Sequence, residues 1–243
     1  MSEHTHPESS TTTEAGLNQT TLELKQVTSD LITVEYRLLP DTNPGANSNY
    51  IAIWQNYDNI PYNQAPTDPP KAIEGNSQRG TVSFPVSLIQ NNYIIGYSVG
   101  PALEAPAQKY GNVCSTVYVP RIPTATALLE AGGHVESEPS DYFFTSLTVG
   151  AVSGDVVTVK YSIPPNCQPK TNGAYLGVFK GAAGYNLALE RAVAIKNNDE
   201  SAWVAITGKF LAGKRYTIAY FNSGYSETTP VLKRMAATVP FVA

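Results

Sequence analysis

The chain has 243 residues, of which 42% are hydrophobic and only 15% are charged, and its formal net charge is −4. An acidic chain of this kind lacks the basic stripe of nucleic-acid-binding proteins, and no apolar run reaches the roughly 18 residues that a membrane-spanning helix needs. We therefore expect neither a nucleic-acid partner nor a membrane span. The 18 glycines, 18 prolines and 15 tyrosines favour a soluble protein of short β-strands and frequent turns.

Residues 1–20 are rich in Ser, Thr and Glu and offer little to bury, so a disordered tail is predicted there. They have neither the basic start nor the apolar centre of a secretory signal, which predicts a cytoplasmic protein, with signal-independent export as the alternative. His4 and His6 fall in this tail and His134 in the later linker. Neither predicted domain therefore holds a histidine for a catalytic triad.

From residue 21 onward the sequence contains one pattern twice. Residues 30–36, DLITVEY, return as residues 155–161, DVVTVKY, and residues 50–54, YIAIW, return as residues 175–179, YLGVF. Both pairs have the same offset (155 − 30 = 175 − 50 = 125), so the interval between the two motifs is preserved as well. This predicts a tandem duplication of one module.

Within each copy the apolar residues alternate as a half-buried strand requires. The inward-facing set is Ile32, Val34 and Tyr36 in the first copy and Val157, Val159 and Tyr161 in the second. Residues 50–54 and 175–179 are apolar on both faces, which is typical of a central strand. A later Tyr-rich pair, at residues 93–97 and 216–220, is expected to pack into the core. About seven short strands per copy predict an immunoglobulin-like sandwich.

The predicted fold is thus all-β: two tandem immunoglobulin-like antiparallel β-sandwiches from an internal duplication. The predicted parts are a tail at 1–20, a first sandwich at 21–120, a linker at 121–141 and a second sandwich at 142–243. Cys114 falls in a late strand of the first copy and Cys167 in an early loop of the second. A disulfide within one sandwich is therefore excluded, and we expect two free thiols, with an inter-domain bridge as the alternative.

In the second copy a Gly-Asp-Val strand start at 154–156 precedes the strand at 175–179, a Tyr-alternating strand at 216–220 and a closing apolar strand at 237–241. This order resembles that of the SKICH domain, an immunoglobulin-like module, and the resemblance covers most of each copy. SKICH domains serve as interaction or targeting modules within larger proteins. The resemblance therefore implies a sandwich fold and a binding role.

Motifs for metals, phosphates or catalysis are not found. Residues 41–49 alternate oxygen ligands as calcium loops do, but position twelve of such a loop is Ala52, where a Glu is required. No Cys-x-x-Cys or His-Glu-x-x-His occurs, and residues 181–184 lack the Lys-Ser/Thr of a phosphate loop. We expect no metal, no cofactor and no enzymatic activity. An enzyme using paired carboxylates is the last of the alternatives.

The best candidate for binding is the segment after the first central strand, which is rich in Tyr, Asn, Gln and Pro. Tyrosine offers rigid contact area with a polar tip, and Asn offers adaptable hydrogen bonds. The second copy differs here, at residues 185–195, and loops carry function more often than strands do. The candidate ligand-binding residues are Trp54, Asn56, Tyr57, Asp58, Tyr62 and Asn63. An extended edge with solvated turns is the competing interpretation.

The predicted function is non-catalytic recognition of a protein or carbohydrate surface through loops and sheet edges. Two copies in a fixed relation would allow bivalent engagement, which raises avidity without new contacts. One alternative is a structural protein that assembles into homo-oligomers through its sandwich edges. Another is a secreted toxin or effector.

Overall fold

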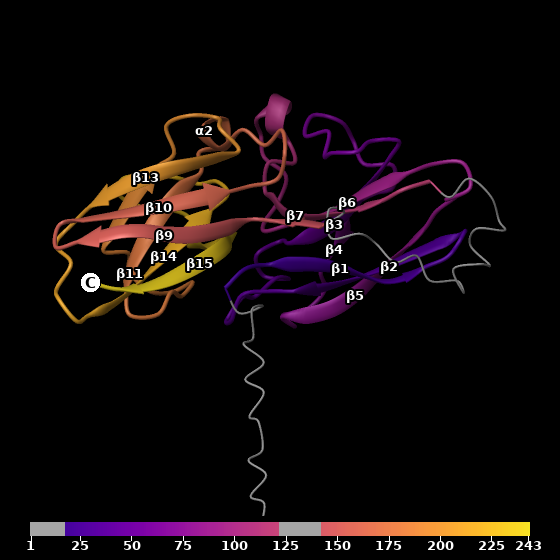
Figure 1. The fold of residues 1–243 in the computed structure, drawn as a ribbon. Coiled ribbons are helices and arrows are strands. Elements are labelled where there is room, and N and C mark those ends of the chain that lie inside the picture. Colours follow the sequence, from indigo (N-terminus) through magenta and orange to yellow (C-terminus); the bar gives the residue numbers. More distant parts are fainter. Residues whose placement is uncertain (1–17, 122–141) are drawn as a thin grey trace, which may run out of the picture.

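The computed structural model describes residues 18–121 and 142–243 (Figure 1). All three histidines and almost all of the predicted linker lie outside the described residues. The described part is built of antiparallel strands, with one short helix, α2 (Pro169–Asn172), and two 3-10 turns, η1 (Pro106–Gln108) and η3 (Leu232–Arg234). The all-β prediction is confirmed. In the described ranges no helix has the length and apolar character that crossing a membrane requires.

The first copy forms two facing sheets. One has the strand order β1-β2-β5, and the other has the order β4-β3-β6-β7-β8. The strands are β1 (Thr21–Val27), β2 (Leu31–Arg37), β3 (Tyr50–Gln55), β4 (Lys71–Ala72), β5 (Arg79–Pro85), β6 (Tyr93–Ser98), β7 (Val113–Val119) and β8 (Tyr142–Phe144).

The second copy repeats seven of these eight strands in the same order, with sheets β9-β10-β13 and β12-β11-β14-β15; among its described residues no strand corresponds to β8. The strands are β9 (Ser146–Ser153), β10 (Val156–Ser162), β11 (Tyr175–Lys180), β12 (Arg191–Ala194), β13 (Ser201–Thr207), β14 (Arg215–Phe221) and β15 (Met235–Val242). Even an irregularity recurs: the register of the last two strands shifts at Tyr97/Ser98 in one copy and at Tyr220/Phe221 in the other. The predicted tandem immunoglobulin-like fold is therefore confirmed in topology.

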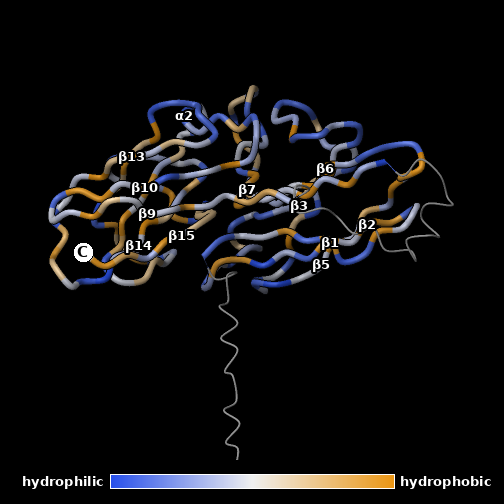
Figure 2. The backbone as a smooth tube through the Cα atoms, in the orientation of Figure 1, coloured by the Kyte–Doolittle hydropathy of each residue, from blue (hydrophilic) through white to orange (hydrophobic). Residues whose placement is uncertain are grey.

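The two cores are built in the same way. In Figure 2 the hydrophobic segments follow the strands, and many of the connecting loops are hydrophilic. Tyr36 and Tyr97 pack with their ring centroids 5.6 Å apart, and Tyr161 and Tyr220 repeat that pair at the same distance. The tyrosines of β6 and β14 are buried, as their alternation predicts.

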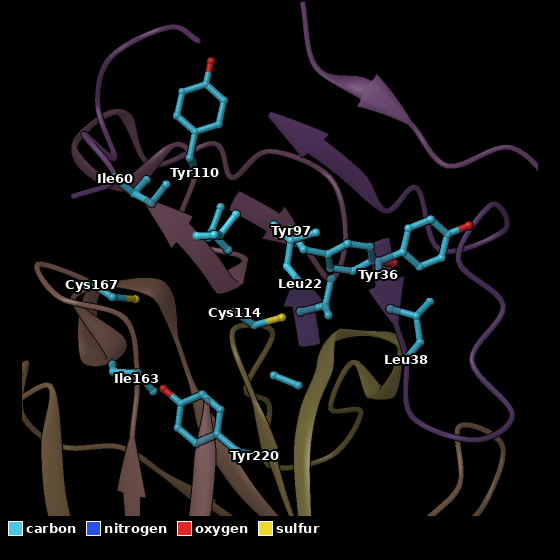
Figure 3. Packing of buried hydrophobic residues seen from close by; sticks show 14 of the residues in the cluster. Leu22, Tyr36, Leu38, Ile60, Tyr97, Tyr110, Cys114, Ile163, Cys167 and Tyr220 are labelled. Carbon is cyan, nitrogen blue, oxygen red and sulfur yellow. The ribbon is translucent and has the colours of Figure 1, made fainter. Parts of the chain in front are cut away.

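The copies are joined through a shared apolar cluster. Figure 3 shows side chains of both copies packed together, with Cys167 between Ile60 of the first copy and Ile163 of the second. Leu39 of the first copy joins a second cluster, on the outer face of β11 and β14. Because one apolar cluster contains buried side chains of both copies, the two sandwiches share part of their core.

Polar contacts add to this interface. The Asn222 amide donates to the Val113 carbonyl at 3.1 Å, and the Ser223 hydroxyl donates to the Asn112 side-chain oxygen at 2.5 Å. The Thr42 and Tyr185 hydroxyls hydrogen-bond to each other at 2.5 Å. Hydrogen bonds of this kind fix the register of an interface that apolar contact alone would leave adjustable.

A segment ahead of each copy pairs with the last strand of the other copy. We call residues 18–20 and 142–145 the leading segments. The Thr20 N–H donates to the Ala236 carbonyl of β15 at 3.1 Å, and the Thr145 N–H donates to the Cys114 carbonyl of β7 at 2.8 Å. These positions are equivalent in the repeat (145 − 20 = 125). The two contacts therefore form a reciprocal pair.

The leading segments change two expectations about where parts begin. Residues 18–20 fall in the predicted tail, but here Gln19 bridges Ala237 and Thr20 is buried. Strand β8 falls in the predicted second sandwich, yet it pairs with β7 and extends a sheet of the first. Backbone hydrogen bonds to an open strand edge account for both, because such bonds need no apolar side chain.

Candidate functional site

Two of the predicted binding residues are buried. Trp54 is fully covered, its indole N–H donates to the Gln64 carbonyl at 3.0 Å, and its ring meets Tyr110 edge-on at 5.4 Å. Tyr62 is only 3% exposed. Trp54 lies in β3, and the loop that follows this strand carries Tyr62 and folds back over the Trp54 side chain. The prediction that Trp54 and Tyr62 present a surface is therefore corrected.

The reason for this burial is a close approach of the loop to β6. A Cβ atom built on Gly96 would lie 3.1 Å from the Ile60 Cδ1 atom, so Ile60 packs directly on that glycine. The loop thus covers an apolar face instead of offering one. The residues of the loop that provide this cover are Ile60 and Tyr62, both of which are buried.

The other four predicted residues are exposed but do not form one site. Asn56, Tyr57 and Asp58 form the tip of the loop, where the Asn92 amide donates to the Tyr57 carbonyl at 3.2 Å and to the Asp58 carboxylate at 3.1 Å. Asn63 is exposed beyond the buried Ile60 and Tyr62. A role for these four in binding stays a prediction.

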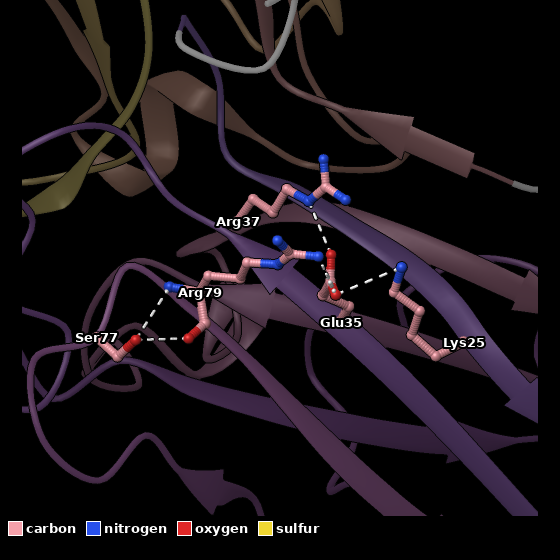
Figure 4. Close-up of polar contacts among 5 residues, drawn as sticks. All are labelled: Lys25, Glu35, Arg37, Ser77 and Arg79. Carbon is pink, nitrogen blue, oxygen red and sulfur yellow. Dashed lines mark hydrogen bonds and ion pairs between the residues drawn. The ribbon is translucent and has the colours of Figure 1, made fainter.

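The outer face of β1-β2-β5 is occupied by ion pairs of its own. The Glu35 carboxylate meets Arg37 at 2.8 Å, Arg79 at 2.9 Å and Lys25 at 3.4 Å (Figure 4). The hydrogen bond from Arg79, aided by Arg37 and Lys25, lowers the pKa of Glu35 to about 2, against an opposing effect of burial. This face is polar and its central charge is already neutralised.

The equivalent face of the second copy, β9-β10-β13, has a different chemistry. Lys160 occupies the position of Glu35, and Trp203 pairs with Lys160 as Thr81 pairs with Glu35. Trp203 is 57% exposed, the largest fraction for any aromatic side chain in the described ranges. A Cβ on Gly150 would lie 2.6 Å from the indole Cζ3 atom, so the ring lies against that glycine. We call Thr148, Gly150, Lys160, Trp203 and Ala205 the Trp203 face.

Sequence reasoning did not single out Trp203, although a signal was present. Val204 and Ile206 of β13 alternate as inward-facing residues, so period 2 directs Trp203 outward. Comparison of the copies strengthens that signal, because Thr81 is an ordinary polar residue for an outward position. The second copy therefore differs from the first at this position, with Trp203 in place of Thr81.

The cysteines are free thiols, as predicted, and both are buried. Burial raises the pKa of the Cys167 thiol to about 12 and that of the Cys114 thiol well above its usual range. Thiols of this kind are poor nucleophiles, because the thiolate is the reactive form. Across residues 18–121 and 142–243 no group of three or more His, Cys, Asp and Glu residues is arranged to hold a metal ion.

Comparisons with known proteins do not place the chain in a family. No protein-family model matches the chain, and no curated protein matches it. The central fibronectin-III array of RIM-binding protein is 10% identical with a TM-score of 0.25, over 94% of this chain and 69% of that one. The FN1–FN3 domains of chicken CNTN1 are 10% identical with a TM-score of 0.27, over 91% of this chain and 62% of that one.

The chain thus spans less than two thirds of the chicken structure. Both TM-scores lie below 0.5, so no function is inferred for this chain from these two structures. None of the comparisons shows the SKICH resemblance. The strand order itself defines the class: a tandem immunoglobulin-like β-sandwich protein.

Proposed function

We propose that this chain is a non-catalytic binding protein that recognises a protein partner through the Trp203 face. The observation that carries the proposal is the exposed indole of Trp203 on an open sheet whose counterpart in the first copy is filled by ion pairs. Trp is strongly enriched among the residues that dominate protein interfaces. The duplicated scaffold presents two such outer sheet faces, and within residues 18–121 and 142–243 no ion pair occupies this one.

The free energy available from covering the Trp203 indole is large enough for this residue to anchor a partner. An indole side chain has about 250 Å² of surface, so covering the 57% that is exposed removes about 140 Å² from water and contributes about 3.5 kcal/mol. That is enough to change a dissociation constant by more than a hundredfold before binding costs are subtracted. The small neighbours Gly150 and Ala205 leave the ring accessible to a flat partner surface.

Site-specific crosslinking tests the proposal. A photoreactive residue at Ala205, beside Trp203, is compared with one at Ser83, the equivalent position on the first copy. We expect a crosslinked protein from Ala205 alone, and we expect Trp203→Ala to abolish it. Because Trp203 is largely exposed, that substitution leaves the fold intact, which circular dichroism verifies. Equal capture at both positions, or capture that persists without Trp203, would refute the proposal.

The same variant, Trp203→Ala, distinguishes self-association from binding to a different protein. Size-exclusion chromatography over a range of concentrations reports whether the chain associates with itself. A dimer that dissociates on Trp203→Ala would make a second copy of this chain the partner. A dimer that survives that substitution would involve another surface.

A further inference from the structure

Strand β13 lies at one edge of the sheet β9-β10-β13 (Figure 1). The Glu200 carbonyl accepts the Ile163 N–H at 2.9 Å, and the Gly208 N–H donates to the Asp155 carbonyl at 2.8 Å, so at both ends of β13 these groups point toward β10. Backbone groups alternate in direction along a strand of an antiparallel pair. The residues whose N–H and C=O groups point away from β10 are therefore Ser201, Trp203, Ala205 and Thr207.

The first copy blocks the same edge, that of β5, in three ways. The Ser77 hydroxyl accepts the Arg79 N–H at 3.4 Å and donates to the Arg79 carbonyl at 2.6 Å (Figure 4). The Lys71 ammonium donates to the Ser83 carbonyl at 2.6 Å. Pro85, the last residue of the strand, has no N–H. Lysines and prolines at a sheet edge protect it from pairing with another chain.

The second copy keeps none of these features at the corresponding positions. Val193 stands where the first copy has Lys71, because each pairs with the same position of its central strand, and Val193 cannot donate a hydrogen bond. Thr207 stands in place of Pro85 (207 − 85 = 122), so the outward N–H is present. Among the described residues, no group is hydrogen-bonded to the outward backbone groups of β13. The edge of β13 is therefore open in the described part of the chain.

The strand at this edge is complementary to a second copy of itself. Its sequence, SAWVAIT, has no charged residue, so two such strands meet without like-charge repulsion. When they run antiparallel about a two-fold axis through Val204, Trp203 of each copy lies opposite the small Ala205 of the other. Ser201 then lies opposite Thr207. Every outward N–H and C=O group gains a partner, which amounts to about eight backbone hydrogen bonds.

We propose that the partner of the Trp203 face is a second copy of this chain, paired through β13 so that the two β9-β10-β13 sheets become continuous. The exposed indole of Trp203 then lies at the junction of the two sheets. This inference rests on the proposed function, because it names the protein that the Trp203 face recognises.

Two substitutions give β13 the edge protection of the first copy. Val193→Lys supplies the counterpart of Lys71, and Thr207→Pro supplies the counterpart of Pro85 and removes an outward N–H. The first copy carries both residues at these positions in the same fold, so we expect both variants to fold, which circular dichroism verifies. Val193→Met and Thr207→Ala are the matched controls, because they add no charge and remove no N–H.

Analytical ultracentrifugation of the full chain over a range of concentrations measures the association. We expect a reversible dimer, and we expect Val193→Lys and Thr207→Pro each to raise its Kd about tenfold or more, because each acts twice in a two-fold dimer. Both controls should keep the Kd of the unaltered protein. The amide hydrogens of Trp203 and Ala205 should exchange slowly only at concentrations at which the dimer forms.

A chain that stays monomeric up to about 1 mM, or a dimer whose Kd is unchanged in the Val193→Lys/Thr207→Pro double variant, overturns the inference. Its failure is distinct from that of the proposed function. If the chain is a monomer and the photoreactive residue at Ala205 captures a different protein only when Trp203 is present, the proposed function holds and this inference fails. If the dimer responds to the edge substitutions but not to Trp203→Ala, the proposed role of Trp203 fails instead.

Discussion

The Glu35 ion cluster allows the most quantitative prediction. Three basic side chains lower the pKa of Glu35 from 4.5 to about 2, with the hydrogen bond from Arg79 as the largest cause. A lowering of this size corresponds to roughly 3 kcal/mol of folding free energy at neutral pH. The three basic partners are 40–64% exposed, so solvent screens their interaction with Glu35, and we expect about 1–2 kcal/mol.

The sign of the pH dependence follows from the lowered pKa. The stabilisation is fully present above pH 4.5 and is lost as pH falls toward 2, because protonation of Glu35 breaks the cluster. Glu35→Gln removes the charge but keeps the shape. We therefore expect it to lower the free energy of unfolding at pH 7 and to differ progressively less from the unaltered protein in acid.

Urea denaturation between pH 7 and pH 3 measures this, because urea is uncharged and leaves the ion pairs unscreened. More than half of the difference between the two proteins should be gone at pH 3. The matched control is Glu190→Gln, which removes an exposed carboxylate that forms no ion pair with any described residue. A Glu35→Gln effect that is the same at both ends of the range would refute the reasoning.

Three further predictions concern the interface and the thiols. Asn222→Ala leaves buried carbonyls, including that of Val113, without a donor, and should lower the free energy of unfolding by about 1–3 kcal/mol in urea denaturation; an unchanged midpoint would contradict this. Deleting residues 1–20 should lower Tm by roughly 2–4 °C relative to deleting residues 1–17, because only the longer deletion removes the contact with β15; equal Tm values would argue against it. Cys114 and Cys167 should react with a thiol reagent at pH 8 only after unfolding, so rapid native labelling would disprove their burial.

The parts of the fold that were predictable are those with a local signal. The alternation of Ile32, Val34 and Tyr36 and its return 125 residues later are visible in the sequence, and they define the strands and the duplication. The burial of Trp54 was not predictable in this way. It depends on a loop that folds back, bringing Gln64 to the indole from ten residues further on, and on Tyr110, which is distant in the sequence.

The Trp203 face and the leading segments illustrate two different limits. The alternation of side chains along β13 predicts that Trp203 points away from the core. Whether another segment then covers it depends on the tertiary structure, which the local pattern does not show. The pairing of Gln19 with Ala237 uses backbone atoms, so no side-chain pattern marks it. Comparing equivalent positions of the repeat is the step that recovers most of this information.

The reciprocal pairing of the leading segments makes this chain the covalent counterpart of a two-fold dimer. In an isologous dimer each subunit gives the other what it receives, and here Thr20 and Thr145 do so within one polypeptide. A single copy cut free would expose the open edge of β7 or β15, the kind of edge that promotes association. Each copy therefore covers a strand edge that the other would leave open.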